Sequence, residues 1–343
     1  MYRNWVKITL ILVYLVIVAG AMVRMTGSGM GCPDWPKCFG YYIPPTEASE
    51  LEWQPNRSFE KGQVIIRNEA LQVATRDFIT TSKFSEENWE LYTRHDYAIF
   101  NVWHTWIEYI NRLLGALAGL AMLIMAILSI WKWRDNKKIT LLSWLSVFAI
   151  GFQGWLGATV VYSVLSPVKI TIHMVMALLI VAFLLYLLYL SKNNKKTFSV
   201  SKKYVMLLVF ALVLTMIQII LGTQVRQFVD DQVALVGYDA KSQWLDNPTM
   251  TFYIHRTFSI IVFALNAWLW FFNRKHNYGL SKINWIFLLI ILEALTGILM
   301  YYFDFPVLSQ PLHLVIASLL FGLQFYVILE AWKKHIPKFV MRQ

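Results

Sequence analysis

Apolar residues gather in eight long runs along this chain, and polar connections separate the runs. Each run is close to the roughly 20 residues that a helix needs to cross the hydrocarbon core of a bilayer. The pattern therefore predicts eight membrane-spanning helices, with both ends of the chain on the same side. The runs cover residues 5–26, 101–131, 139–162, 170–190, 204–226, 250–272, 284–303 and 310–332.

Basic residues decide which side holds the ends. They cluster at Arg3 and Lys7, in the connections 132–138, 191–203 and 273–282, and in the tail after residue 331. By the positive-inside rule these regions face the cytoplasm, so we expect both termini there, in the cell (inner) membrane. The net charge of +11 thus follows from membrane orientation and does not indicate nucleic-acid binding.

Composition agrees with this topology, because 57% of the residues are hydrophobic and only 15% are charged. A soluble fold of this length has no interior large enough for so much apolar surface. The connection 27–100 is the exception, with eleven acidic residues against seven Lys or Arg. It is predicted to be a polar loop on the outside of the membrane, where disulfides persist.

Short motifs recur in the two halves of the chain, which predicts an all-α fold of two tandem, pseudo-symmetric four-helix bundles. The first bundle covers 1–195 and includes the external loop 27–100, and the second covers 196–343. The offset between matching motifs drops after the first pair of helices, so the loop is an insertion in one copy. The matched pairs are Gly20 with Gly222, Arg24 with Arg226, Asn111 with His255, Arg112 with Arg256, Gly157 with Gly297, and His173 with His313.

Histidines occupy equivalent depths near the outer ends of the predicted helices. His255 and His313 come from two helices of the second bundle, as two axial ligands of a haem iron would. The alternative is a pair of histidines that only pack in the core. The first bundle keeps His173 but has Asn111, a poor iron ligand, at the other position.

A carboxylate inside a membrane span is costly and indicates a functional site. Glu108 shares one helical face with His104 and Asn111, and its repeat counterpart is Phe252, so the two bundles are not chemically equivalent. His104 lies about 10 Å further out than Asn111. It is a substitute ligand only if the macrocycle sits higher, and otherwise a hydrogen-bond partner of Glu108. The alternative for Glu108 is a packing acid bonded to His104 or Arg112.

Other charged residues lie near the same outer level. Two arginines per bundle could hold the propionates of a haem by forked hydrogen bonds, the alternative being side chains that snorkel to the interface. Glu293 is matched by Gln153 in the repeat, which suggests a polar packing site, and we assign it no role. The four arginines are Arg24, Arg112, Arg226 and Arg256.

With these residues in view, the chain resembles the haem A synthase family over all eight helices. The motifs that carry the resemblance are "VRMTGSGMGCPDWPKC", "EYINR", "FQGWLGATV", "IHMVMA", "QIILGTQVR", "YIHR" and "PLHLVIAS". The resemblance implies a haem b cofactor on His255 and His313, and substrate haem O in the first bundle with His173 as one ligand. It also implies that Glu108 is the catalytic carboxylate that assists oxidation of a porphyrin methyl group to a formyl group.

The family pattern has a histidine where this chain has Asn111, so His173 alone, or His173 with His104, would hold the substrate iron. The resemblance implies haem O synthase and cytochrome oxidase or its assembly factors as partners, besides membrane lipid. Two other functions fit the histidines: a dihaem b-type electron-transfer protein, and a non-catalytic haem-binding oxidase assembly factor.

The glycine-rich stretch after the first span does not form a nucleotide site, because "GSGMG" lacks the Lys-Ser/Thr ending of a P-loop. Cys32 and Cys38 are the only cysteines, and no further Cys or His stands at zinc spacing. On the outer side of the membrane, six residues apart, they are expected to form a disulfide. A structural staple and a redox-active pair, as in some members of the family, are both compatible with the sequence.

Overall fold

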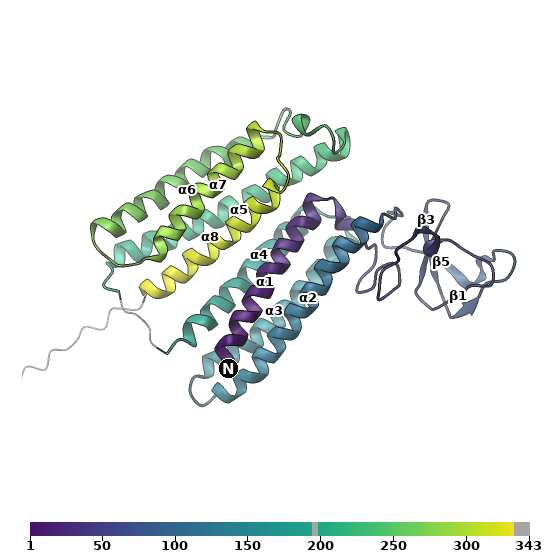
Figure 1. The fold of residues 1–343 in the computed structure, drawn as a ribbon, viewed down its shortest axis with the longest axis horizontal. Helices are drawn as coiled ribbons and strands as arrows, with labels where there is room; N and C mark the ends of the chain where they lie inside the picture. The colour runs from purple at the N-terminus through teal and green to yellow at the C-terminus, as the bar shows by residue number, and fades with distance from the viewer. Residues whose placement is uncertain (194–197, 333–343) are drawn as a thin grey trace, which may run out of the picture. The chain divides into compact units, whose positions relative to one another are not determined.

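Helices dominate the computed structural model, which describes residues 1–193 and 198–332 (Figure 1). Within these residues, eight helices are long and apolar enough to cross a membrane, which confirms the predicted fold class. The basic residues expected at 194–197 and in the tail from 333 lie outside the described residues. The helices are α1 (Tyr2–Met25), α2 (Val102–Ser129), α3 (Lys137–Tyr162), α4 (Pro167–Leu190), α5 (Lys202–Val236), α6 (Met250–Lys275), α7 (Lys282–Tyr302) and α8 (Ser309–Trp332).

The helix α5 extends ten residues beyond its apolar run, which ends at Arg226. Arg226 Nη2 lies 2.7 Å from Asp230 Oδ1 one turn further on, and Val229 and Val233 are buried in a small cluster with Trp244. An ion pair four residues apart and a buried apolar face both support a helix. The hydropathy pattern locates the apolar span and misses this extension, because acidic residues interrupt its apolar positions.

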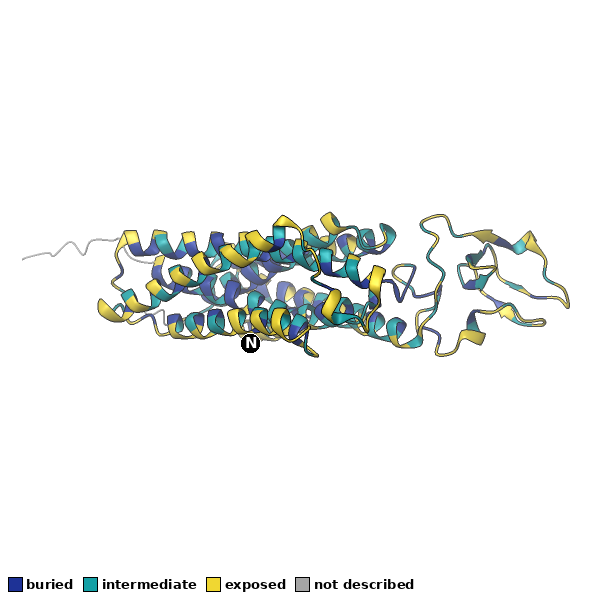
Figure 2. Ribbon diagram, turned by 90° about the horizontal axis from the view of Figure 1, so that it is seen from above, coloured by how far each residue is buried: buried dark blue, intermediate teal, exposed yellow. Residues whose placement is uncertain are grey.

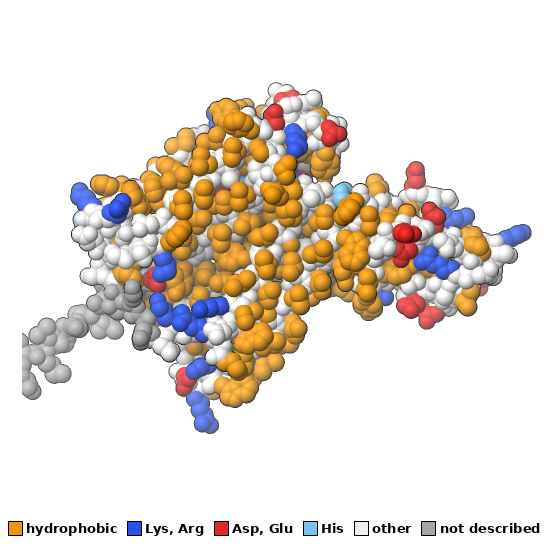
Figure 3. All heavy atoms as spheres, viewed as in Figure 1, with side chains coloured by type: hydrophobic (Ala, Val, Ile, Leu, Met, Phe, Trp, Pro, Cys, Tyr) orange, Lys and Arg blue, Asp and Glu red, His pale blue; other side chains and the backbone are white. Residues whose placement is uncertain are grey.

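Large apolar side chains cover the outward faces of the helices. Figure 3 shows hydrophobic side chains along the helices in view, with charged side chains gathered on the connections. Phe148 and Ile260 are 71% and 66% exposed, whereas the faces that helices turn toward one another are buried (Figure 2). A soluble protein does not leave this much apolar surface open, so the exposed faces are suited to lipid.

The chain divides into two compact units, which we describe separately. The loop-bearing unit comprises Ile11–Ala121 and Val147–Ala177, and the C-terminal unit comprises Met1–Leu10, Met122–Ser146 and Leu178–Gln343. The boundary at residue 195, which follows from sequence repetition, stays a prediction, as do the tandem bundles and the cytoplasmic termini.

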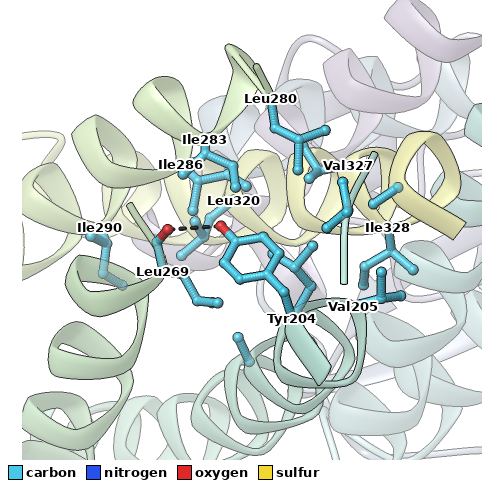
Figure 4. Close-up of a cluster of buried hydrophobic side chains, with 14 of the residues drawn as sticks. Tyr204, Val205, Leu269, Leu280, Ile283, Ile286, Ile290, Leu320, Val327 and Ile328 are labelled. Carbon is cyan, nitrogen blue, oxygen red and sulfur yellow. Dashed lines mark hydrogen bonds between the residues drawn. The ribbon is translucent and has the colours of Figure 1, made fainter. Parts of the chain in front are cut away.

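In the C-terminal unit, four helices pack in a ring. The helix α5 packs against α6 and α8, and α7 packs against the same two helices, so α6 and α8 stand at opposite corners. One end of this ring is filled by aliphatic side chains around Tyr204, whose hydroxyl donates a 2.7 Å hydrogen bond to the Leu269 carbonyl (Figure 4). A satisfied tyrosine hydroxyl lets a large ring be buried without the cost of an unpaired polar group.

The external connection contains β-structure, which the sequence analysis did not anticipate. Two antiparallel pairings build a three-stranded sheet in the order β2-β3-β5, and β1 pairs with β4. The tight hairpin between β2 and β3 turns through Asn68 and Glu69, both with positive φ, as this turn type requires. The strands are β1 (Ser58–Phe59), β2 (Val64–Arg67), β3 (Ala70–Ala74), β4 (Phe78–Ile79) and β5 (Trp89–Leu91).

Candidate functional site

The loop after α1 lies directly against the first turns of α2. Thr105 Oγ1 donates a 2.8 Å hydrogen bond to the Gly31 carbonyl, and the Cys32 amide donates one of 2.8 Å to Glu108 Oε2. A Cβ atom on Gly31 would overlap the backbone of His104. Glycine is therefore required for this approach, which brings the backbone of the cysteine loop, Gly31–Cys38, onto the Glu108 carboxylate.

Glu108 is buried, with 5% of its side chain exposed, and both of its carboxylate oxygens have partners. Besides the Cys32 amide, Arg112 Nη2 lies 2.5 Å from Glu108 Oε1. In the described part of the chain, no hydrogen bond joins Glu108 to His104. The bond to Arg112 is thus the one that the sequence left open as an alternative, and it compensates the buried negative charge.

Arg112 also holds the cysteine loop from the α2 side. Its Nη1 donates to the carbonyls of Asp34 and Lys37 at 2.6 and 2.9 Å, and its Nη2 donates to the Cys32 carbonyl at 3.0 Å. One guanidinium thus binds a carboxylate and three backbone carbonyls. The role of Arg112 as a propionate ligand stays a prediction, and the structure engages both of its amino groups elsewhere.

The cysteine loop is closed by the disulfide between Cys32 and Cys38, which confirms the predicted pairing. Asp34 accepts hydrogen bonds from the amides of Phe39 and Gly40, at 2.6 and 2.8 Å. Burial raises the pKa of the Asp34 carboxyl, and these hydrogen bonds and the nearby Arg112 charge offset part of that rise. Asp34 was not predicted from the sequence, because an acidic residue in a polar loop is normally exposed to solvent.

Residues of the β-rich insertion also touch this loop. The Tyr92 hydroxyl donates to the Pro33 carbonyl at 3.1 Å, and His95 Nε2 lies 2.8 Å from the same oxygen. The insertion therefore supports the cysteine loop through the Pro33 carbonyl.

A glycine on one helix faces the imidazole or amide of the next at four repeat-related places. In the loop-bearing unit, a Cβ built on Gly157 would lie 3.4 Å from His173 Cε1, and one built on Gly20 would lie 4.0 Å from Asn111 Oδ1. Gln153 Nε2 donates to the His173 carbonyl at 3.0 Å. Asn111 thus stands where the repeat places an imidazole, and its Oδ1 is buried with no hydrogen-bond partner among the described residues.

Similar contacts occur in the C-terminal unit, on the helix pair that matches Gly20 and Asn111. A Cβ on Gly222 would lie 3.2 Å from His255 Cε1, and Gln218 Nε2 donates to the His255 carbonyl at 3.0 Å. At the position that corresponds to Glu108, Phe252 is buried and stacks on Tyr301. The two units therefore share a histidine cradle, and only the loop-bearing unit adds a carboxylate at this position.

Helices α6 and α8 are linked across the ring by a buried amide pair. Gln324 Nε2 donates a 2.9 Å hydrogen bond to Asn266 Oδ1. His255 and His313 each precede their member of this pair by eleven residues, about three helical turns. Since α6 and α8 run in the same direction, the two histidines occupy the same inward faces at a common depth. The two imidazoles would thus be placed to hold a haem between α6 and α8.

His313 has two polar neighbours on α7, of which the sequence indicated Glu293 only as a polar packing site and did not single out Thr296. Its Nδ1 lies 3.0 Å from Glu293 Oε2 and 2.8 Å from Thr296 Oγ1, both on α7. A Cβ on Gly297 would lie 3.8 Å from His313 Cε1. Glu293 and Thr296 lie one turn apart on α7, and the next helix along the chain carries His313. This spacing is the sequence signal that could have identified them.

The remaining arginines have local contacts. Arg226 pairs with Asp230 on the polar end of α5. The Arg256 guanidinium lies 5.7 Å from the centre of the Tyr301 ring. Propionate binding by these two and by Arg24 stays a prediction.

Known proteins resemble this chain over most of its length. A family model described as cytochrome oxidase assembly protein (COX15-CtaA) matches residues 3–325. A protein named heme A synthase from Bartonella tribocorum is 27% identical over 90% of this chain and 86% of its own, and one from Flavobacterium johnsoniae is 21% identical over 94% and 96%. A third, from Shewanella oneidensis, is 46% identical, but the match covers only 15% of this chain and 16% of that protein.

Proposed function

This chain belongs to the cytochrome oxidase assembly protein family (COX15-CtaA), and on that premise we propose that it is a haem A synthase. The enzyme oxidises a methyl group of haem O to the formyl group of haem A, which serves cytochrome oxidase. When the added oxygen comes from water, the change passes electrons to an electron acceptor outside this chain and releases protons, so the site must remove protons near the reacting carbon.

Glu108 carries this proposal, because it is a buried carboxylate with fixed direction at a predicted haem site. The Cys32 amide and the Arg112 guanidinium hold its two oxygens. A carboxylate so placed stabilises positive charge that develops on the substrate, and it accepts a proton by shifting away from Arg112. The low dielectric of a membrane interior strengthens both effects.

The test of this role is conversion of haem O by purified protein, followed by extraction and chromatography of the haem. Glu108→Gln keeps the volume of the side chain and removes its charge, and we expect haem A formation to fall by a factor of about 100 or more, within the usual range for an acid–base group. Glu330→Gln, a buried carboxylate on α8 that pairs with Lys282, is the matched control. Normal haem A from Glu108→Gln would exclude the assignment.

His173 is the proposed protein ligand of the substrate iron in the loop-bearing unit. Asn111 and His104 border the same region of α2, with Asn111 in the repeat position of an imidazole. We expect the substrate haem to have one strong protein ligand, which leaves it high-spin. Optical and electron paramagnetic resonance spectra with haem O bound would show this, and Asn111→His should convert the signal to low-spin.

The C-terminal unit is the proposed site of a haem b cofactor, held by His255 and His313. These residues fit a haem, since the two imidazoles lie at the same depth on α6 and α8, at opposite corners of the four-helix ring. In addition, His255 Nδ1 is buried and has no hydrogen-bond partner among the described residues. Haem b, when bound, supplies one-electron redox chemistry. His313→Ala should remove the low-spin haem b spectrum, and an unchanged spectrum would contradict the site.

We further propose that the disulfide acts as a staple. It fixes the backbone of Cys32, whose amide binds Glu108, so an intact bond keeps that carboxylate in place. Cys32→Ser should lower thermal stability while turnover persists. Loss of turnover at unchanged stability would favour a redox relay.

The proposed setting is the cell membrane, with both termini in the cytoplasm and both haem sites near the outer face. Haem O synthase, which supplies the substrate, and cytochrome oxidase or its assembly factors are the proposed partners. Surrounding lipid contacts the exposed apolar helix faces.

A second candidate is a haem-binding assembly factor without catalysis, which Asn111 favours because it replaces an iron ligand. Haem O that stays unchanged in the purified protein, with haem b bound, would support it. A dihaem electron-transfer protein would instead contain two redox-active b haems and no haem A.

A further inference from the structure

We propose that Glu293 and Thr296 are positioning residues for His313, which orient its ring for iron and lower the reduction potential of the haem bound there. The inference rests on the haem b site proposed above. It concerns side chains on α7 that have no part in the proposed conversion of haem O.

The neighbours of His313 Nδ1 favour a proton on that ring nitrogen. Thr296 Oγ1 donates to the carbonyls of Leu292 and Glu293, both 3.0 Å away, and so keeps its lone pairs for an N–H. Nδ1 lies 2.8 Å from this oxygen and 3.0 Å from Glu293 Oε2, so a proton on Nδ1 can be shared by two acceptors. With the proton on Nδ1, Nε2 keeps the lone pair that an iron requires.

This arrangement is particular to His313. The Nδ1 atoms of His173 and His255 are buried and have no hydrogen-bond partner among the described residues. In the repeat, Gln153 stands in the place of Glu293, and its amide binds the backbone carbonyl of His173 and not the ring. A carboxylate at this position is thus a specific addition to the C-terminal unit.

The expected consequence is electrostatic. A carboxylate that accepts from the far nitrogen of a ligating imidazole makes that imidazole a stronger donor. Glu293 has 12% of its side chain exposed, and its Oε1 has no hydrogen-bond partner among the described residues. Burial by itself disfavours a charged carboxyl, and the added positive charge of a ferric haem on His313 would offset this cost. A charged Glu293 would therefore stabilise the ferric state, which carries one more positive charge than the ferrous state.

The test uses full-length protein purified with its haem b, whose midpoint potential is measured by spectroelectrochemical titration. Glu293→Gln keeps the shape but not the charge. We expect the equilibrium constant for reduction to increase at least tenfold, which is a rise of about 59 mV for a one-electron couple. Thr296→Val, which removes only the neutral acceptor, should shift the potential less and in the same direction. The ferric electron paramagnetic resonance g-values should move in both variants.

Glu330→Gln is the matched control, because it removes another buried carboxylate from the same unit. Glu330 is seventeen residues from His313 on α8, about 25 Å along the helix axis. We expect the midpoint potential of haem b in Glu330→Gln to equal that in the unaltered protein. Equal shifts in Glu330→Gln and Glu293→Gln, or no shift in Glu293→Gln and Thr296→Val, would overturn the inference. Absence of haem b from the unaltered protein would instead contradict the proposed function.

Discussion

Arg112 shows how one side chain joins two chemical features that lie far apart in the sequence. Its guanidinium contacts the carboxylate one turn away on α2 and three carbonyls of the cysteine loop. The planar fork of arginine presents several donors at fixed angles, which a lysine ammonium cannot reproduce. The position of Glu108 therefore depends on Arg112 as much as on α2.

Arg112→Lys should consequently reduce conversion of haem O at least tenfold while haem b in the C-terminal unit keeps its spectrum. The substitution retains one positive charge but loses most of the hydrogen bonds to the loop carbonyls. Each hydrogen bond to a charged group contributes about 1.5–3 kcal/mol. Chromatography of extracted haem measures the effect. Arg76→Lys serves as control, since Arg76 makes exposed contacts, an ion pair with Glu87 and a hydrogen bond to Asn88. Equal activity of the two variants would refute the role of Arg112.

Asp34 gives the cysteine loop a pH dependence of known sign. Its pKa is raised in the folded protein, so the folded state binds the proton more tightly than the unfolded state does. Stability from this group is therefore present below the ordinary aspartate pKa, roughly 3.9, and is lost as the pH rises through the raised value. We expect the melting temperature of the protein, relative to Asp34→Asn, to decrease across this window. A difference that stays constant with pH would contradict the prediction.

At the scale of the element, a glycine on one helix packs against a histidine ring on the neighbouring helix at three places. The close approach of Gly222 to His255, of Gly157 to His173 and of Gly297 to His313 leaves little or no room for a further side chain between helix and ring. The orientation of each histidine is thus set by the neighbouring helix, and not only by the helix that carries it.

Gly222→Ala should therefore displace the His255 ring. The added Cβ would lie 3.2 Å from Cε1, and overpacking of this kind costs about 1–3 kcal/mol. We expect a lower content of haem b per protein, measured by the pyridine haemochrome method. Gly115→Ala on α2 meets nothing within 4 Å, so it should retain full haem content and be slightly more stable. Identical haem content in the two variants would argue against the cradle.

At the scale of the whole molecule, charge along the chain sets the predicted orientation. The connections in which Lys and Arg cluster alternate with connections without such clusters, and the loop in which acidic residues outnumber basic ones lies between α1 and α2. This pattern predicts that the cysteine loop, with its disulfide, lies on the oxidising side of the membrane.

Reporter fusions test the orientation directly. Alkaline phosphatase joined after residue 240 should be active, because it is exported, whereas green fluorescent protein joined after residue 278 or after the full chain should fluoresce. The reverse pattern at any of these sites would contradict cytoplasmic termini.

Much of the fold was predictable because the bilayer acts on local sequence. Twenty apolar residues in a row are sufficient for a span, and the eight runs agree with α1 to α8. The hairpin at Asn68 and Glu69 and the extension of α5 beyond its apolar run were not predicted. The strands are short, and acidic residues interrupt the apolar positions of the extension, so neither is distinct in the hydropathy pattern.

The candidate site divides in the same way. The sequence by itself determined the spans, the repeated histidine positions and the unmatched acid Glu108, since each is visible as a residue type at a depth in the membrane. Only the tertiary structure decided that Arg112 and the Cys32 amide hold Glu108, and that Glu293 binds the ring of His313. Hydrophobicity is a property of each residue, whereas hydrogen bonds between distant segments exist only once packing has brought their donors and acceptors into contact.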